Sequence, residues 1–207
     1  MPILTQDHLT VTARTLEEGM AFVEERLGVP LETGGRHAAM GTHNRLLGLG
    51  ESLYLEVLAI DPEAASPSHP RWFDLDRFSG APRLSNWVAR CASLTEALRC
   101  APAGSGKPMS LERGALRWEM AVPGDGRLPF DGCFPALIAW AGNTHPADIL
   151  PDRQCRLKSL ELQHPRAEAL RQALQGLLDD PRIEITWASA PGLRGRILTP
   201  AGECVLD

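Results

Sequence analysis

The clearest pattern of hydrophobic and polar positions lies between Gly34 and Pro62. Two apolar runs, at residues 46–49 and 53–60, are separated by a Gly-Glu-Ser turn. Short apolar runs bounded by Gly, Ser, Asp and Pro are typical of a β-hairpin. Glu56 lies inside the second run, where burying a charge is costly unless another group pairs with it. The pattern therefore predicts two paired strands that carry one unusual acidic position.

The same order of elements occurs three times along the chain. Residues 8–13 alternate as a strand, Thr15 is a candidate N-cap, and Gly28 ends the helix that precedes the hairpin. A second copy has a strand followed by a helix capped by Ser93, and a third copy begins with a strand near residue 156. We therefore predict an α+β fold of tandem βαβββ modules, whose open, curved mixed β-sheets form half-barrels with the helices packed outside.

These copies define the predicted units. The first module covers residues 1–62, a connector covers residues 63–83, the second module covers residues 84–150, and a third, βαβββ-like module covers residues 151–207. The connector is rich in Pro and Ser, and its aromatic residues predict that it packs on the body of the protein. The sequence leaves open which modules share a sheet, and a third module could also pair across a homodimer.

Composition narrows the function classes. The chain has 207 residues, of which 43% are hydrophobic and 23% charged, so it can bury a sizeable core. A net charge of -5 without a run of Lys or Arg argues against nucleic acid as a partner. The sequence shows neither an apolar segment of the roughly 18 residues that span a membrane nor a signal peptide, so we expect a cytoplasmic protein without a membrane partner. Five scattered cysteines without C-x-x-C spacing are typical of reduced thiols.

Candidate chemistry gathers near the hairpin. His8, His37 and His43 precede Glu56 along the chain, and a carboxylate with imidazoles on neighbouring strands can form a metal site or an acid-base site. Glu56 and His37 are the candidate catalytic residues. In the alternative interpretation, the strand turns Glu56 toward water, as half-solvated antiparallel strands often do.

Other residues are candidates for binding a small molecule. Asn44 lies in a turn-like segment and either bonds its own backbone or orients a substrate oxygen. The second module carries Trp87, Trp118 and Trp140 on predicted strands, where they form either core or the apolar walls of a pocket. Arg90 and Arg117 are candidate cations for an anionic substrate, and His145 is either a loop histidine or a residue that covers the pocket.

Several motifs together suggest a family. They are DHL at residues 7–9, LG at 27–28, GGRH at 34–37, GTHNRLLGLG at 41–50, YLEVLAID at 54–61, FPALIAW at 134–140 and THP at 144–146. With these motifs the chain resembles the glyoxalase-like members of the vicinal oxygen chelate superfamily. The resemblance implies paired βαβββ modules that curl into an open barrel around a divalent metal. Each module then usually offers one metal ligand from its first strand and one from its last.

The resemblance implies only part of such a ligand set. His8 and Glu56 match the ligand positions of the first module. In the second module Asn86 matches His8, and the position that matches Glu56 falls near Ala139 or one residue to either side. His37 would add a third donor to the metal site of His8 and Glu56. Two protein ligands with water would hold Mg²⁺ or Mn²⁺ weakly. Tight binding of Zn²⁺, Fe²⁺ or Ni²⁺, the other candidate metals, would depend on the third ligand.

Two functions of different classes follow. In the first, the protein is a metal-assisted lyase, isomerase or dioxygenase that acts on a small oxygenated molecule. In the second, it is a metal-free binding protein that sequesters a small apolar ligand or confers resistance to it. With Asn86 and Ala139 where the second pair of ligands would be, the sequence favours a four-ligand metal enzyme less, but it leaves open a site built from His8, His37 and Glu56 alone.

Overall fold

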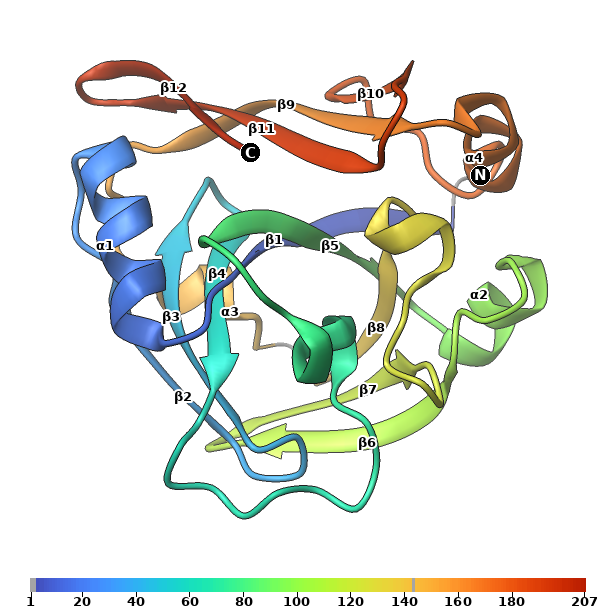
Figure 1. The fold of residues 1–207 in the computed structure, drawn as a ribbon, viewed down its shortest axis with the longest axis horizontal. Coiled ribbons are helices and arrows are strands. Elements are labelled where there is room, and N and C mark those ends of the chain that lie inside the picture. The colour runs from blue at the N-terminus through green and yellow to red at the C-terminus, as the bar shows by residue number, and fades with distance from the viewer. Residues whose placement is uncertain (1–2, 143) are drawn as a thin grey trace.

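The computed structural model describes residues 3–142 and 144–207, and its strands form two sheets (Figure 1). The larger sheet has eight strands in the order β2-β3-β4-β1-β5-β8-β7-β6 and curls into a half-barrel. Its first four strands come with one helix: β1 (Leu4–Thr12), α1 (Leu16–Leu27), β2 (Glu32–His37), β3 (Thr42–Gly48) and β4 (Tyr54–Ile60). Its other four repeat that order: β5 (Arg83–Cys91), α2 (Leu94–Cys100), β6 (Lys107–Arg113), β7 (Leu116–Val122) and β8 (Ala136–Ala141).

The first two predicted modules share this sheet through β1 and β5. The two strands run antiparallel, and each is parallel to the last strand of its own repeat, β4 or β8. Leu9 faces Trp87 across the β1–β5 pair, and these two residues are as far apart in sequence as the helix caps Thr15 and Ser93. The two halves of the half-barrel are therefore related by a pseudo-two-fold axis close to Leu9 and Trp87.

Both helices of the half-barrel begin at the predicted caps. The side chain of Thr15 accepts a hydrogen bond from the backbone N–H of Glu18, and Ser93 does the same for Glu96. Helix α1 ends at Gly28, whose φ of 68° is left-handed and suits a residue without a Cβ. Helix α1 packs against the outer face of β4 through its buried positions.

The third predicted module forms the second sheet. Its elements are β9 (Arg156–His164), α4 (Ala167–Leu174), β10 (Ile183–Trp187), β11 (Gly192–Thr199) and β12 (Gly202–Leu206), preceded by the one-turn helix α3 (Pro146–Ile149). The strand order is β10-β9-β11-β12, so β9 is parallel to β10 and antiparallel to β11. In the half-barrel, by contrast, the first strand of each repeat lies beside the last. The third module thus keeps the order of elements along the chain but pairs its strands differently.

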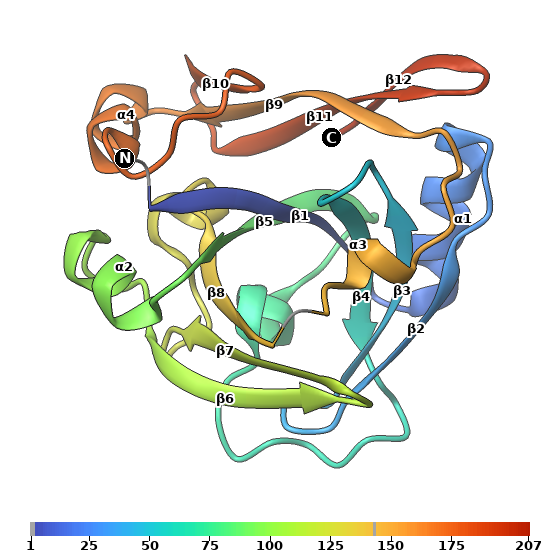
Figure 2. The ribbon, with the colours of Figure 1, turned by 180° about the vertical axis from the view of Figure 1, so that it is seen from behind.

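The second sheet covers the convex side of the half-barrel above β1 and β5 (Figures 1 and 2). One core joins the two sheets and includes Leu9 and Trp87 from the half-barrel with Leu160 and Ile197 from the second sheet. Gly195 marks the closest approach, because a Cβ at this position would lie 3.2 Å from a methyl carbon of Leu84. The second sheet therefore buries the apolar outer face that the half-barrel alone would expose.

The concave side of the half-barrel is filled by the connector. Residues Trp72–Arg77 form a short 3-10 segment, called the connector turn below, and Trp72, Phe73 and Leu75 are buried against the inner residues of β7 and β8. This placement confirms that the aromatic residues of the connector pack on the body of the protein. None of the helices in the described part of the chain is long and apolar enough to cross a membrane.

Candidate functional site

Strands β1 and β4 place His8 and Glu56 side by side on the concave face. Thr10 pairs with Glu56 in the parallel register, and alternation along β4 turns Leu55 and Val57 to the opposite, outer face. Nε2 of His8 lies 3.6 Å from Oε2 of Glu56, and each residue is only 5% exposed. The strand therefore does not expose Glu56 to bulk water, which excludes the half-solvated interpretation.

Asp7 contacts the imidazole of His8 on the side away from Glu56. A register shift between Gln6 and His8 makes Asp7 an extra residue in β1, so its carboxylate lies on the same side as its neighbour. Oδ1 of Asp7 lies 2.6 Å from Nδ1 of His8. Oδ2 lies 2.9 Å from both Nε1 of Trp140 and Nε2 of His145. Burial tends to raise the pKa of Asp7, but the hydrogen bonds and charges of His145 and His8 outweigh burial and hold that pKa well below its usual range.

These contacts fix the protons on the histidines. Because Asp7 is a carboxylate, Nδ1 of His8 carries the hydrogen that lies between them. Nδ1 of His145 accepts the backbone N–H of Ala147, so Nε2 of His145 is the nitrogen that donates to Asp7. Nε2 of His8 then faces Glu56 with a lone pair or a second proton. The two groups lie close enough to act on the same bound molecule.

Asn44 positions the other oxygen of Glu56. Its Nδ2 donates to Oε1 of Glu56 at 2.5 Å, while its own Oδ1 accepts the backbone N–H of Gly35 at 2.8 Å. A Cβ at Gly34 would lie 2.0 Å from Oδ1 of Asn44, so only glycine allows this approach. Asn44 therefore bonds both the backbone and Glu56, and these two hydrogen bonds hold the carboxylate of Glu56 in one orientation.

His37 is paired with a cation. Nε2 of His37 lies 3.0 Å from a guanidinium nitrogen of Arg113, and Nδ1 lies 3.1 Å from the hydroxyl of Thr42. Because a guanidinium can only donate, Nε2 accepts and Nδ1 carries the hydrogen. Burial lowers the pKa of His37 to about 4, and the positive charge of Arg113 acts in the same direction. His37 is therefore neutral near pH 7 and holds Arg113 in place.

A small cavity, called the Glu56 cavity below, lies among these groups. Its polar walls come from His8, His37, Tyr54, Glu56 and Arg113, and its apolar walls include Trp72, Trp118 and Trp140. Its volume of about 20 Å³ leaves room for about one water molecule. Burial, with the negative charges of Asp7 and Glu56, raises the pKa of Tyr54 well above its usual value, so the phenol stays protonated.

The structure brings together most of the predicted residues. The predicted residues that line the cavity from the concave face are His8, His37, Glu56, Trp118 and Trp140. Trp87 lies elsewhere, because alternation along β5 turns it to the convex face. There it is fully buried in the core between the sheets, and its Nε1 donates to the carbonyl oxygen of Cys133 at 2.9 Å.

The two arginines that were candidate cations lie in different places. Arg90 approaches Asp7 at 3.6 Å from its Oδ2, at the back of the site. Arg117 pairs with Glu112 on an exposed face and does not reach the cavity. His145, which the sequence left as a loop residue or a cover, lies at the site as the third hydrogen-bond donor to Asp7.

The residues fit a metal ion poorly in this arrangement. Within residues 3–142 and 144–207 no three His, Cys, Asp or Glu side chains converge as a metal-binding group. The guanidinium of Arg113 lies against His37, the predicted third ligand, and would repel a cation there. Nδ1 of His8 is already bonded to Asp7, which leaves Nε2 of His8 and one oxygen of Glu56 as the remaining donors.

The second module offers no further donor pair. Thr10 pairs with Glu56 in the first module, and the equivalent pair in the second module is Val88 with Ala136. The position that matches Glu56 is thus Ala136 and not Ala139, which lies on the opposite face beside Glu119. An alanine side chain cannot bind a metal at either position.

Sequence reasoning missed Asp7, Tyr54 and Arg113. Strict alternation places Asp7 opposite to His8, and only the extra residue in β1 brings them together. Arg113 is the last residue of β6, and its strand position alone does not indicate that it reaches the first module. Gly35 was the available signal, because a Cβ there would lie 2.7 Å from the side chain of Arg113. A Gly-Gly pair in a strand indicates that other groups approach the backbone closely.

Comparisons with known proteins agree with this architecture. A family model described as a glyoxalase-like domain matches residues 6–178. A hypothetical protein from Staphylococcus aureus has a similar structure, with a TM-score of 0.62 and 12% identity over 91% of this chain and 88% of that one. Methylmalonyl-CoA epimerase from Mycobacterium tuberculosis gives a TM-score of 0.44 and 16% identity over 70% of this chain and 92% of that one. The comparison with curated proteins finds no match.

Proposed function

The chain belongs to the glyoxalase-like domain family, within the vicinal oxygen chelate superfamily, and on that basis we propose that it binds a small oxygenated molecule in the Glu56 cavity and transfers a proton on it. The observation that carries the proposal is the buried His8–Glu56 pair at 3.6 Å, backed by Asp7 at 2.6 Å. A buried acid and a buried base this close together can act on one bound molecule without help from bulk water.

The reaction class is proton abstraction beside a carbonyl group. Glu56 takes the proton from the carbon, the electron pair of the broken C–H bond forms a C–C double bond, and the carbonyl oxygen becomes an enolate oxygen. His8 then returns a proton to the opposite face of the same carbon, the carbonyl group re-forms, and the inverted carbon completes an epimerisation. The same abstraction followed by loss of a group at the next carbon gives a lyase.

Arg113 is the group suited to the negative charge that develops on the oxygen. It lines the cavity, and in the described part of the chain its guanidinium contacts a neutral histidine and pairs with no carboxylate. A guanidinium that is fixed before the reaction stabilises an enolate oxygen more effectively than mobile water does. The substrate therefore presents its carbonyl oxygen to Arg113 and its acidic carbon to Glu56.

The cavity must widen for such a molecule. With room for about one water, it admits a substrate only when the connector turn, which supplies Trp72 and Phe73, shifts away from the sheet. The remaining walls belong to strands of the half-barrel and are held by their ladders. We therefore place the moving wall at the connector turn.

The test is hydrogen exchange on simple carbonyl compounds. Pyruvate, 2-oxobutyrate and glycolaldehyde are incubated with the protein in D₂O, and NMR follows the loss of protons beside the carbonyl. We expect exchange above the buffer rate with at least one compound, and Glu56→Gln should lower it by about 100-fold or more, as removal of a general base does. Glu119→Gln, an exposed position on β7, is the matched control and should keep the full rate.

A second candidate is a binding protein, as the three tryptophans of the cavity wall favour an apolar ligand. The binding protein would be favoured over the enzyme by two results together. A small apolar compound would quench tryptophan fluorescence in a saturable way, and none of the carbonyl compounds would show hydrogen exchange. The elemental content of the purified protein is measured alongside. A stoichiometric metal that is lost in both His8→Ala and Glu56→Ala would contradict the conclusion that these residues fit a metal poorly.

A further inference from the structure

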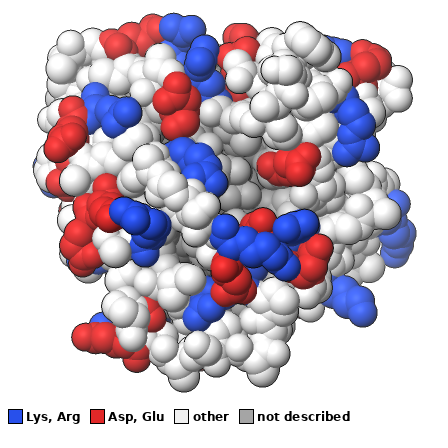
Figure 3. Space-filling model, viewed as in Figure 1, with Lys and Arg blue, Asp and Glu red and all other residues white. Residues whose placement is uncertain are grey.

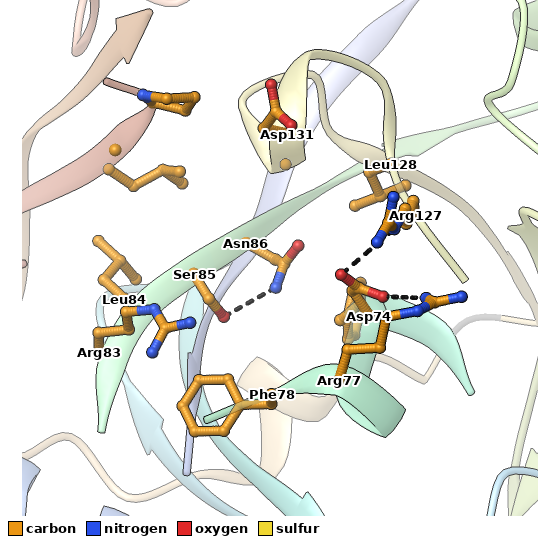
Figure 4. A pocket seen from close by; sticks show the side chains of 15 residues that line it. Asp74, Arg77, Phe78, Arg83, Leu84, Ser85, Asn86, Arg127, Leu128 and Asp131 are labelled. Atoms are coloured by element: carbon orange, nitrogen blue, oxygen red, sulfur yellow. Dashed lines mark hydrogen bonds and ion pairs between the residues drawn. The ribbon is translucent and has the colours of Figure 1, made fainter. Parts of the chain in front are cut away.

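A wider cavity of about 390 Å³, called the rim cavity below, opens at the edge of the half-barrel. It lies where β5, the connector turn, residues 127–132 and the start of β11 meet (Figure 4). Figure 3 shows basic and acidic side chains around a hollow on this face. Phe73 lines both this cavity and the Glu56 cavity, so one side chain separates the two. The volume is in the range of small-molecule sites.

The walls of the rim cavity carry an excess of positive charge. Three arginines and two aspartates line it, which leaves a net charge of +1. Asp74 pairs with Arg77 and, at 3.5 Å, with Arg127 (Figure 4). Arg83 instead donates to the carbonyl oxygen of Ser79 at 2.8 Å, and its guanidinium lies over the ring of Phe78. In the described part of the chain no carboxylate pairs with Arg83, so its charge is fixed in place without a counter-ion.

The floor of the rim cavity offers a free acceptor on a largely buried residue. Asn86 is only 5% exposed, and its Nδ2 donates to the hydroxyl of Ser85 at 2.7 Å. Figure 4 shows its amide oxygen turned away from Ser85, and within the described residues this oxygen has no hydrogen-bond donor. This oxygen is not among the fully buried polar atoms of the described residues that lack a partner, so it is open to the cavity and can accept from a ligand hydroxyl or amino group.

The pseudo-two-fold axis relates this floor to the acid-base site. Asn86 occupies in the second half of the sheet the position that His8 occupies in the first. The partner position of Glu56 is Ala136, so the second half keeps a polar residue on the first strand but lacks the acid. An amide and an alanine can bind a molecule but cannot exchange a proton with it. The rim cavity is thus the binding counterpart of the reactive one.

The backbone around the rim cavity is strained. Phe73, Asp74, Phe130 and Asp131 have φ between 53° and 58°, and they are four of the five non-glycine residues with positive φ in the described chain. Phe73, Asp74 and Asp131 line the rim cavity. Bulky side chains adopt this conformation only where the surroundings enforce it, and such residues cluster at ligand sites.

We propose that the rim cavity binds a small molecule through an oxyanion group, a carboxylate or a phosphate, that pairs with Arg83. Arg127 and Arg77 lie on the same wall and add donors, while Asn86 accepts a hydroxyl or amino group of the same molecule. A planar guanidinium binds either oxyanion through two parallel hydrogen bonds. This site goes beyond the proposed proton transfer, and its polar groups are not those of the proton transfer.

The experiment measures binding of two probes, inorganic phosphate and glycolate, by NMR shifts of the Asn86 side-chain amide and the Arg83 guanidinium, with calorimetry for affinity. At least one probe should shift both groups in a saturable way. Phosphate alone would identify a phosphate-bearing ligand, glycolate alone a carboxylate-bearing one, and both probes an oxyanion site that accepts either. Arg83→Gln should weaken binding about tenfold or more, the loss expected for one charge-assisted hydrogen bond of the fork.

Three further variants keep the test decisive. Asn86→Asp changes one atom group but adds a negative charge to the floor, so it should abolish binding, with the thermal midpoint reporting that the fold persists. Arg99→Gln, an exposed arginine at the end of α2, should bind like the wild type. Glu56→Gln should also keep full binding, which separates this proposal from the proton-transfer function. Absence of saturable shifts with both probes, or equal affinity in Arg83→Gln, would overturn the proposal.

Discussion

At the scale of single residues, the site depends on how a buried charge is satisfied. Glu56 receives Asn44 on one oxygen and faces His8 on the other, and His8 in turn rests on Asp7. A carboxylate in an apolar strand is tolerated only with such partners. The carboxylate of Asp7 fixes the imidazole of His8, whereas the carboxylate of Glu56 stays free to accept a proton. The two acids on either side of His8 therefore have different surroundings because their partners differ.

The stability of the protein should depend on pH through His37. Its pKa is about 4 in the folded protein, against 6.5 for an unperturbed histidine, because burial disfavours the imidazolium. Between these values the unfolded chain binds more protons, so stability is complete above about pH 6.5 and falls as the pH is lowered toward 4. The loss is about 3 kcal/mol at most. Urea unfolding at a series of pH values measures it.

Substitution of this histidine isolates its part of the pH dependence. His37→Gln should flatten the fall between pH 6.5 and 4, whereas His69→Gln, in the connector, should leave it unchanged. An NMR titration of the wild type gives the pKa directly. A value near 6.5 for His37 would show that the imidazole is open to water and that its contact with Arg113 does not form.

The sequence predicts the central pair of this site but not its supports. Glu56 stands out because it interrupts an apolar strand, and His8 because it lies on the opening strand of the same module. Asp7 cannot be assigned from alternation, since a bulge reverses the direction of its side chain. Arg113 comes from the other half of the sheet, and its contact with His37 depends on how β2 and β6 approach across the open barrel.

At the scale of elements, α1 packs closely against the sheet because Gly19 has no side chain. A Cβ at Gly19 would lie 2.5 Å from a methyl carbon of Val57 and 2.9 Å from the Cβ of Ala13. Glycine inside a helix normally costs about 1 kcal/mol relative to alanine. Here it allows the helix backbone to reach β4, whose inner face carries Glu56.

Gly19→Ala should therefore destabilise the protein in spite of the gain in helix propensity. The added methyl group overpacks the α1–β4 contact, which typically costs about 1–3 kcal/mol. Denaturant unfolding gives the change. In a Val57→Ala background the same substitution should cost less, because the nearest methyl group is gone while the contact with Ala13 stays. Equal costs in both backgrounds would show that the helix does not press on Val57.

Element boundaries were mostly predictable because their signals are local. Thr15, Gly28 and Ser93 mark the helix ends by capping, which depends on neighbours in sequence. The connector turn was predictable only in part. Its aromatic residues indicated burial, but their position inside the half-barrel follows from contacts with β7 and β8, which are remote in sequence.

At the scale of the whole molecule, repetition along the chain predicted the half-barrel but did not fix the third module. Three copies with the same order of elements suggest three equal units. The structure instead joins the first two in one sheet and gives the third its own strand order. Local pattern determines where strands begin, whereas strand order depends on which apolar faces meet. Trp87 illustrates this, because its burial between the two sheets was not readable from its own strand.

The shared core predicts that the two sheets unfold together. Leu160 lies in β9 of the second sheet, is fully buried, and belongs to the same core as Leu9 and Trp87 of the half-barrel. Leu160→Ala should lower the free energy of unfolding by about 2–5 kcal/mol. Because the core is common, hydrogen exchange should speed up at amides of β1 and β5 as well as β9. Leu198→Ala, at an exposed position on β11, is the control and should have a much smaller effect. Faster exchange confined to β9–β12 would show that the second sheet opens by itself, and the convex face of the half-barrel would then have to be stable without its cover.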